Sequence, residues 1–207
     1  MQWVHFPLHP DTPADGQSLA DLFRWRSVDL KAMYEQMRQR MAAEGLPYSE
    51  RSMTYNSRLA QELGKWAETQ PGGGALHDAL FRAVFVRDVN IGEVDVLVDI
   101  AAAVGLDPTE ARRVVTERTF RQAIDDDWAR SLHIGVTGVP TFVAGRQGVV
   151  GAQPYEILTE LLDRAGASKR GAGNVTFDGV LEIGGCAGGA CVPSPPAEVA
   201  ARPLDDE

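Results

Sequence analysis

The spacing of apolar positions changes twice along this chain, and each change marks a different kind of secondary structure. QWVHF at 2–6 is β-branched and aromatic, which is typical of a short strand, and the prolines within 7–13 exclude a helix directly after it. From Ser18 to about His133 the apolar residues recur every three or four positions, which indicates helices. After Pro140 the pattern is again that of strands. The predicted order is therefore a strand, several helices, a strand hairpin and a final helix.

Start and stop signals divide the helical stretch into individual helices. The most complete set is Asp107 as the cap, Pro108 at the first helical position and Glu110 at the third. Asn56 or Ser57 can cap another helix. We predict helices over about 18–26, 28–44, 57–68, 75–87, 94–104, 107–116 and 117–133.

The second of these helices carries a stripe of methionines. Met33, Met37 and Met41 recur at helical spacing. A methionine stripe could form a pliable binding groove, but at this spacing we expect it to face the core.

The end of the chain changes character once more. TFVA and VVGA within 141–152 are separated by the turn GRQG and predict a hairpin, and 153–166 predicts a closing helix. Beyond it glycine, proline and small residues dominate, although NVTFDGVLEI allows one or two further strands, and we expect the last, acidic residues to be mobile. The predicted organisation is a domain over 1–166, with a helical insertion at about 18–133, and an extension over 167–207.

Pro140 stands at the start of a predicted strand, in the sequence TGVPTF. Proline inside a strand removes a backbone donor, so it is confined to strand starts, edges or bulges. Gly135 and Gly138 make the preceding segment a loop. A cis bond before such a proline is known in tight turns, but about 5–6% of X-Pro bonds are cis, so these residues alone favour an ordinary trans proline.

Composition restricts the partners of this protein. The 207 residues carry 20 basic and 29 acidic side chains, a net charge of −9, which disfavours nucleic acid as the main partner. No apolar run approaches the roughly 20 residues of a membrane helix, so we expect no membrane partner. MQWVHFPLHP lacks the basic and apolar segments of a signal peptide, and we therefore expect a cytoplasmic protein.

Histidine and cysteine supply the candidate chemistry. The four histidines, His5, His9, His77 and His133, lack the short spacings of a zinc site, so we expect no metal and interpret each as a surface or satisfied core residue. His5 and His9 would share one side of an extended segment. No other cofactor is indicated.

The two cysteines, Cys186 and Cys191, form a C-x4-C pair in CAGGAC. The small residues between them allow the sulfurs to approach the geometry of a disulfide. A close pair in a cytoplasmic protein is more readily redox-active or metal-linked than structural, but two inert thiols in a flexible tail remain an alternative.

Four stretches occur in a fixed order over residues 2 to about 165: FPLHPDTP, ALFRAVFVRDVNIGEVDVLVDIAAAVGLD, LHIGVTGVPTFV and GVVGAQPYEIL. Together they resemble the DsbA-like thioredoxin-fold family, specifically its FrnE-like cytosolic branch. The resemblance implies an α/β fold, a thioredoxin-like sheet with a helical insertion. It also implies that Pro140 is cis and that Val139 and Pro140 contact an extended substrate beside a redox dithiol. A second C-x4-C near the end of FrnE-like proteins corresponds to Cys186 and Cys191.

The chain departs from this family at its start. The family has a strand and a helix carrying C-x-x-C before the strand that corresponds to QWVHF, and neither is present in this sequence. Either the sequence begins inside a longer protein or this is a relative without that dithiol. We favour the first explanation, because the lost helix would leave one face of the sheet bare.

The leading functional hypothesis is a thiol–disulfide oxidoreductase, impaired by the absent C-x-x-C and acting on protein or small thiol and disulfide substrates through Cys186 and Cys191. One alternative is a glutathione-dependent enzyme resembling 2-hydroxychromene-2-carboxylate isomerase. Another is a non-catalytic module that binds an extended segment at its sheet edge and Pro140 loop. The sequence leaves the substrate, the redox direction and the oligomeric state, including a homodimer, open.

Overall fold

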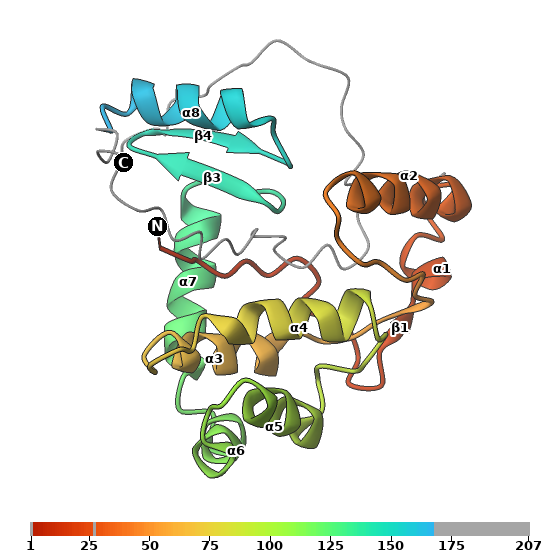
Figure 1. Ribbon diagram of the computed structural model, residues 1–207, viewed down its shortest axis with the longest axis vertical. Helices are drawn as coiled ribbons and strands as arrows, with labels where there is room; N and C mark the ends of the chain where they lie inside the picture. The colour runs from red at the N-terminus through yellow and green to blue at the C-terminus, as the bar shows by residue number, and fades with distance from the viewer. Residues whose placement is uncertain (1, 27, 168–207) are drawn as a thin grey trace.

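The computed structural model describes residues 2–26 and 28–167, in which helices predominate (Figure 1). The helices are α1 (Leu19–Leu22), α2 (Leu30–Ala43), α3 (Arg58–Ala67), α4 (Ala75–Phe85), α5 (Val94–Ala103), α6 (Pro108–Glu117), α7 (Arg121–His133) and α8 (Tyr155–Arg164). The strands are β1 (Gln17–Ser18), β2 (Met53–Thr54), β3 (Thr141–Ala144) and β4 (Gln147–Val150). None of the helices in these described ranges is long and apolar enough to span a membrane.

The hydrophobic core lies among α3, α4, α5 and α6. Each helix turns one apolar face inward, and the fully buried side chains include Leu63 of α3, Leu76 of α4, Leu97 of α5 and Val114 of α6. The predicted start of α6 is confirmed, because the Asp107 carboxylate accepts hydrogen bonds from two backbone N–H groups of the first turn. The core is therefore built by the helices that the sequence predicted most clearly.

α3 is also tied to its neighbours by a buried ion cluster. Glu62 is completely buried, and its carboxylate accepts hydrogen bonds from Arg58 at 2.7 Å and from Arg118 at 2.6 and 2.7 Å. Arg58 additionally donates to the Asp125 carboxylate of α7 at 2.6 Å. Burial acts to raise the pKa of Glu62, but the bonds from the two guanidinium groups outweigh it and lower the pKa. Glu62 is thus a charged group that joins α3 to the segment between α6 and α7.

The helix predicted from residue 117 starts later than expected. Arg118 has a φ of 56°, in the left-handed region, and ends α6, so that α7 begins at Arg121.

The methionine stripe is the other helical expectation that was wrong. Met33, Met37 and Met41 are only half-buried, and no side chain of α2 is buried. The reason is visible in Figure 1, where α2 stands apart from the core helices.

The strands form two separate antiparallel pairs. β3 pairs with β4 as the predicted hairpin, with Thr141 opposite Val150 and Ala144 opposite Gln147, and α8 packs on both strands. β1 pairs with β2 over two residues each, a pairing that the sequence did not predict. Gly16 permits this second contact, because its φ is +85° and a Cβ there would lie 2.6 Å from the Tyr55 ring.

The predicted N-terminal strand is not formed. Residues 2–6 are extended but pair with no strand among the described residues. The backbone N–H of His5 instead donates to the Asp127 carboxylate of α7 at 3.2 Å. The segment therefore lies between the hairpin and the core helices (Figure 1), and is held there by side chains rather than by a strand ladder.

Candidate functional site

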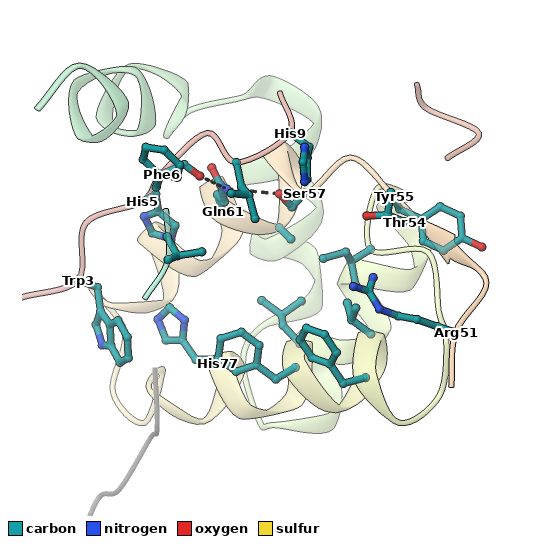
Figure 2. A pocket seen from close by; sticks show the side chains of 18 of the residues that line it. Trp3, His5, Phe6, His9, Arg51, Thr54, Tyr55, Ser57, Gln61 and His77 are labelled. Carbon is teal, nitrogen blue, oxygen red and sulfur yellow. Dashed lines mark hydrogen bonds between the residues drawn. The ribbon is translucent and has the colours of Figure 1, made fainter. Parts of the chain in front are cut away.

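A cavity of about 180 Å³ lies between the N-terminal segment and helices α3 and α4. Figure 2 shows its lining side chains converging from the N-terminal segment above and from α4 below. The lining residues are Trp3, Val4, His5, Phe6, Leu8, His9, Arg51, Thr54, Tyr55, Ser57, Ala60, Gln61, His77, Leu80, Phe81, Val84, Phe85, Ile91 and Val139. Most of them are apolar or aromatic. Figure 2 shows polar side chains at both ends of the cavity, and His9, Ser57 and Gln61 between the ends.

α4 forms the floor because it carries apolar residues on two faces. Leu76 is directed into the core, whereas Phe81, Val84 and Phe85 line the cavity and are half-buried. The rings of Phe81 and Phe85 lie 6.4 Å apart between centroids, in a tilted arrangement. The middle of the cavity is therefore lined by aromatic and branched aliphatic side chains.

One polar end is built around His5. Its Nδ1 lies 3.0 Å from the Asp127 carboxylate, which also accepts a hydrogen bond from Lys65 Nζ at 2.9 Å. Burial acts to raise the pKa of Asp127, but the bonds from His5 and Lys65 outweigh it and lower the pKa to about 2. An ionised carboxylate thus fixes one nitrogen of the His5 ring and the position of the N-terminal segment.

His77 completes this end of the cavity. Its ring stacks on Trp3 with centroids 5.3 Å apart, and it approaches Gly64 of α3 so closely that a Cβ there would lie 3.4 Å from the ring. Burial, together with the charge of His5, lowers the pKa of His77 to about 4. The Nε2 atom is buried and has no hydrogen-bond partner among the described residues, and the nearest carboxylate oxygen, from Glu68, is 3.9 Å away. His77 is therefore a neutral imidazole at neutral pH.

The opposite end combines a cation with a hydroxyl group. The guanidinium of Arg51 lies 5.0 Å from the centroid of the Phe85 ring, and its Nη1 donates to the Met53 carbonyl at 3.4 Å. Thr54, which follows Met53 in β2, is 1% exposed, and its Oγ1 has no hydrogen-bond partner among the described residues. Figure 2 shows Arg51 and Thr54 on the same side of the cavity, opposite Trp3, His5 and His77.

The Pro140 loop borders the same cavity. The bond between Val139 and Pro140 is cis, the isomer implied by the family resemblance, and Val139 contributes to the lining. The loop is fixed on both sides of the proline: the Thr141 hydroxyl donates to the Gly138 carbonyl at 2.7 Å, and the Gly151 N–H donates to the Pro140 carbonyl at 2.7 Å. The cavity and the predicted substrate loop are therefore neighbours.

The structure brings only some of the candidate residues from the sequence analysis together at this cavity. His5, His9 and Val139 line the cavity, while His133 is exposed at the end of α7. Cys186 and Cys191 lie outside the described residues. Within the described ranges no group of histidine, cysteine and acidic residues is arranged to hold a metal ion.

Sequence reasoning missed the roles of His77, Arg51 and Thr54. Arg51 and Thr54 lie in one segment at β2 and His77 lies on α4, and these two segments meet beside the N-terminal segment only through the packing of the chain. No spacing or motif in the sequence indicates that these segments contact one another. His77 was interpreted as a surface or satisfied core residue, but its Nε2 is buried and has no hydrogen-bond partner among the described residues, with the Glu68 carboxylate 3.9 Å away.

Comparison with known proteins identifies a family for most of this chain. The model of the DSBA-like thioredoxin domain matches residues 1–163. The crystal structure of a probable DsbA oxidoreductase, SCO1869 from Streptomyces coelicolor, is similar with a TM-score of 0.69 and 28% sequence identity, over 81% of this chain and 76% of that one. The uncharacterized protein YwbO of Bacillus subtilis (strain 168) is 30% identical over 108 residues, which is 50% of this chain and 52% of that protein. The chain thus matches about half the length of this curated relative.

Proposed function

The chain belongs to the family of DSBA-like thioredoxin domains, and from this premise we propose that it is a thiol–disulfide oxidoreductase of the FrnE-like type. The sequence contains no C-x-x-C, and its thiols are Cys186 and Cys191. The proposal assigns the exchange chemistry to these two residues and the binding of the substrate to the loop around Val139 and Pro140.

The observation that carries the proposal is the position of this loop. Val139 borders a cavity with an apolar floor, and β3 begins one residue after Pro140. An extended substrate lying along the loop would have both a strand edge and an apolar pocket beside it. This arrangement supports a protein or small disulfide as the substrate.

The chemistry proceeds in two balanced steps. A thiolate of the C-x4-C pair attacks one sulfur of the substrate disulfide, so that a mixed disulfide forms and the other substrate sulfur leaves as a thiolate. The second cysteine then attacks the mixed disulfide, which releases the substrate as a dithiol. The protein becomes oxidised by two electrons, with a bond between Cys186 and Cys191, and the reverse sequence oxidises a substrate dithiol.

The test is an insulin-reduction assay with dithiothreitol as the terminal reductant. We expect the full chain to accelerate reduction and the double variant Cys186→Ser, Cys191→Ser to match the uncatalysed rate. One of the two single variants should accumulate a mixed disulfide with insulin, because the resolving thiol is missing. Equal activity of the wild type and the double variant, or two free thiols in the wild type after mild oxidation, would contradict the proposal.

A second candidate is a non-catalytic module that binds extended peptides. It is favoured by one observation: β3 pairs with β4 on one side, and no further strand of the described residues pairs with its other edge. An unpaired edge is a template for strand addition. The two candidates differ in the double cysteine variant, which would keep full peptide binding if the protein is a binding module alone.

A further inference from the structure

We propose that the cavity between the N-terminal segment and α4 is a binding site for a phenol, whose hydroxyl group lies between the imidazoles of His5 and His77 and whose ring lies over the aromatic floor. This site is separate from the thiol chemistry, because none of its lining residues is a cysteine. Three features carry the inference: the size of the cavity, the fixed tautomer of His5, and two buried polar atoms of the lining that have no hydrogen-bond partner among the described residues.

The size and the lining favour one aromatic ring. An engineered apolar cavity of about 150 Å³ holds benzene, and this cavity of about 180 Å³ is slightly larger. The tilted rings of Phe81 and Phe85 offer a face and an edge to a planar ligand. A single ring with a short substituent therefore fits better than a long chain or a polycyclic molecule.

His5 contributes a hydrogen-bond acceptor to the lining of this cavity. The Asp127 carboxylate lies 3.0 Å from Nδ1 of His5, and it also accepts hydrogen bonds from the backbone N–H of His5 and from Lys65 Nζ. An ionised carboxylate at this distance requires the proton of the neutral ring on Nδ1, so Nε2 carries the lone pair. A ligand atom that meets Nε2 must therefore donate a hydrogen bond, which a hydroxyl group does and a carboxylate or an ether does not.

The rings of His5 and His77 both lie against Gly64 of α3. A Cβ at Gly64 would lie 3.4 Å from Cε1 of His77 and 3.8 Å from Nε2 of His5, so the missing side chain lets the two rings converge there. Figure 2 shows both rings at the same end of the cavity. Nε2 of His77 is buried and has no hydrogen-bond partner among the described residues. Because a phenol oxygen donates one hydrogen bond and accepts another, a single hydroxyl group would pair with both imidazoles.

A second buried atom, at the opposite end, indicates a second polar group on the ligand. Thr54 is 1% exposed, and its Oγ1 has no hydrogen-bond partner among the described residues. Buried hydroxyl groups are normally paired, so this one points to a ligand group that supplies the partner. The neighbouring Arg51 donates to the Met53 carbonyl and lies over the Phe85 ring, and its charge is given no part in recognition. A phenol with a short neutral polar substituent matches both ends of the cavity.

Calorimetric titration of the full-length protein at pH 8 tests the site, with 4-hydroxybenzyl alcohol as the probe and benzyl alcohol as the matched compound without the phenolic hydroxyl. At this pH an ordinary imidazole and a phenol are both neutral. We expect the probe to bind one site with a Kd of roughly 1 mM or tighter, the range open to a ligand of this size. Benzyl alcohol should bind at least about fivefold more weakly, because it leaves the nitrogens of His5 and His77 without a partner.

Three substitutions connect binding to this cavity. His77→Phe keeps a ring against Trp3 and removes Nε2, and Thr54→Val keeps the shape and removes Oγ1, so each should weaken the probe about fivefold or more. Neither should lower the free energy of unfolding at pH 8, because each removes a polar atom that has no hydrogen-bond partner in the described part of the chain. Val84→Phe fills the space above α4 and should abolish binding, whereas the matched control Val143→Phe, on the exposed face of β3, should leave the Kd unchanged.

A phenol reaches such a cavity either as a small molecule or as the tyrosine side chain of a peptide. The peptides Gly-Tyr-Gly and Gly-Phe-Gly, both acetylated and amidated, distinguish these sources. If the tyrosine peptide binds more tightly than both the phenylalanine peptide and 4-hydroxybenzyl alcohol, the site receives a tyrosine of a peptide. If 4-hydroxybenzyl alcohol binds more tightly than the tyrosine peptide, the site receives a free phenol.

Three results would overturn the site: no binding of 4-hydroxybenzyl alcohol at about 10 mM, ten times the expected Kd, equal affinity for this probe and benzyl alcohol, or unchanged binding in His77→Phe. If Val84→Phe fails to fold, His77→Phe and Thr54→Val still decide the question, because each removes only polar character. Binding should be the same in the variant Cys186→Ser, Cys191→Ser. A failure of the oxidoreductase assay therefore leaves this result unaffected, and the two proposals fail separately.

Discussion

Replacement of Glu62 by glutamine should destabilise the protein far more than the same change at an exposed ion pair. Glu62 is completely buried and accepts three hydrogen bonds of 2.6–2.7 Å from two arginines. Glutamine keeps one acceptor oxygen but turns an NH₂ group toward a guanidinium and leaves the positive charges unbalanced. Breaking a buried pair by removing one partner costs about 3–5 kcal/mol.

The structure places the expected loss near the lower end of that range. The Arg118 side chain is 37% exposed and recovers hydration, and Arg58 retains Asp125 as a partner. We therefore expect the free energy of unfolding to fall by roughly 3 kcal/mol. For a domain of 150–250 residues this corresponds to a decrease in Tm of about 6–12 °C.

The assay is urea unfolding followed by circular dichroism, with thermal melts as a second measure. The matched control is Glu110→Gln, which removes one carboxylate from an exposed pair with Arg113 and should cost far less stability, because water screens an exposed pair. If Glu62→Gln lost no more than Glu110→Gln, the buried cluster would contribute no net stability, and our account of how α3 is joined to the segment between α6 and α7 would be wrong.

Two further predictions concern pH. The His77 ring should titrate with a midpoint near pH 4 in an NMR titration. Because its pKa in the unfolded chain is about 6.5, the free energy of unfolding should fall by roughly 3 kcal/mol between pH 6.5 and 4 and then level off. A midpoint between pH 6 and 7 would contradict the burial of this ring. Asp127 has a lowered pKa of about 2, so its contribution is complete above pH 4 and is lost as the pH falls toward 2. Asp127→Asn should remove that low-pH loss and accelerate amide exchange in residues 3–6 at pH 7, whereas Asp126→Asn, on the same helix, should change neither.

The elements that were predicted correctly are those whose signals are local. Asp107 and Pro108 start α6 as their side chains and backbone dictate, and the turn after β3 forms the expected hairpin. The strand expected at residues 2–6 failed because a strand requires a neighbour, and none of the described residues supplies one. The methionine stripe of α2 failed for a related reason, since periodicity shows that a face is apolar but not which surface covers it.

The candidate site was only partly predictable from the sequence, because local signals do not show which distant side chains come into contact. Pro140 could be singled out because a proline at the start of a strand is a local exception. His77 and Thr54 could not, because a buried imidazole nitrogen and a buried hydroxyl that have no hydrogen-bond partner among the described residues are properties of the packed chain. Their partners, or the lack of them, depend on side chains separated by tens of residues.

The division between the core helices and the hairpin has a consequence for how the molecule opens. β3, β4 and α8 pack on one another, yet Leu161 is the one buried side chain of α8, and Val143 and Val150 are 44% and 52% exposed. Local opening costs least where few apolar contacts are lost. The hairpin and α8 should therefore form a separate foldon that unfolds while α3 to α6 remain intact. The Pro140 loop lies at the junction of the two units, so fluctuations of the hairpin would widen or narrow the cavity mouth without disturbing its floor.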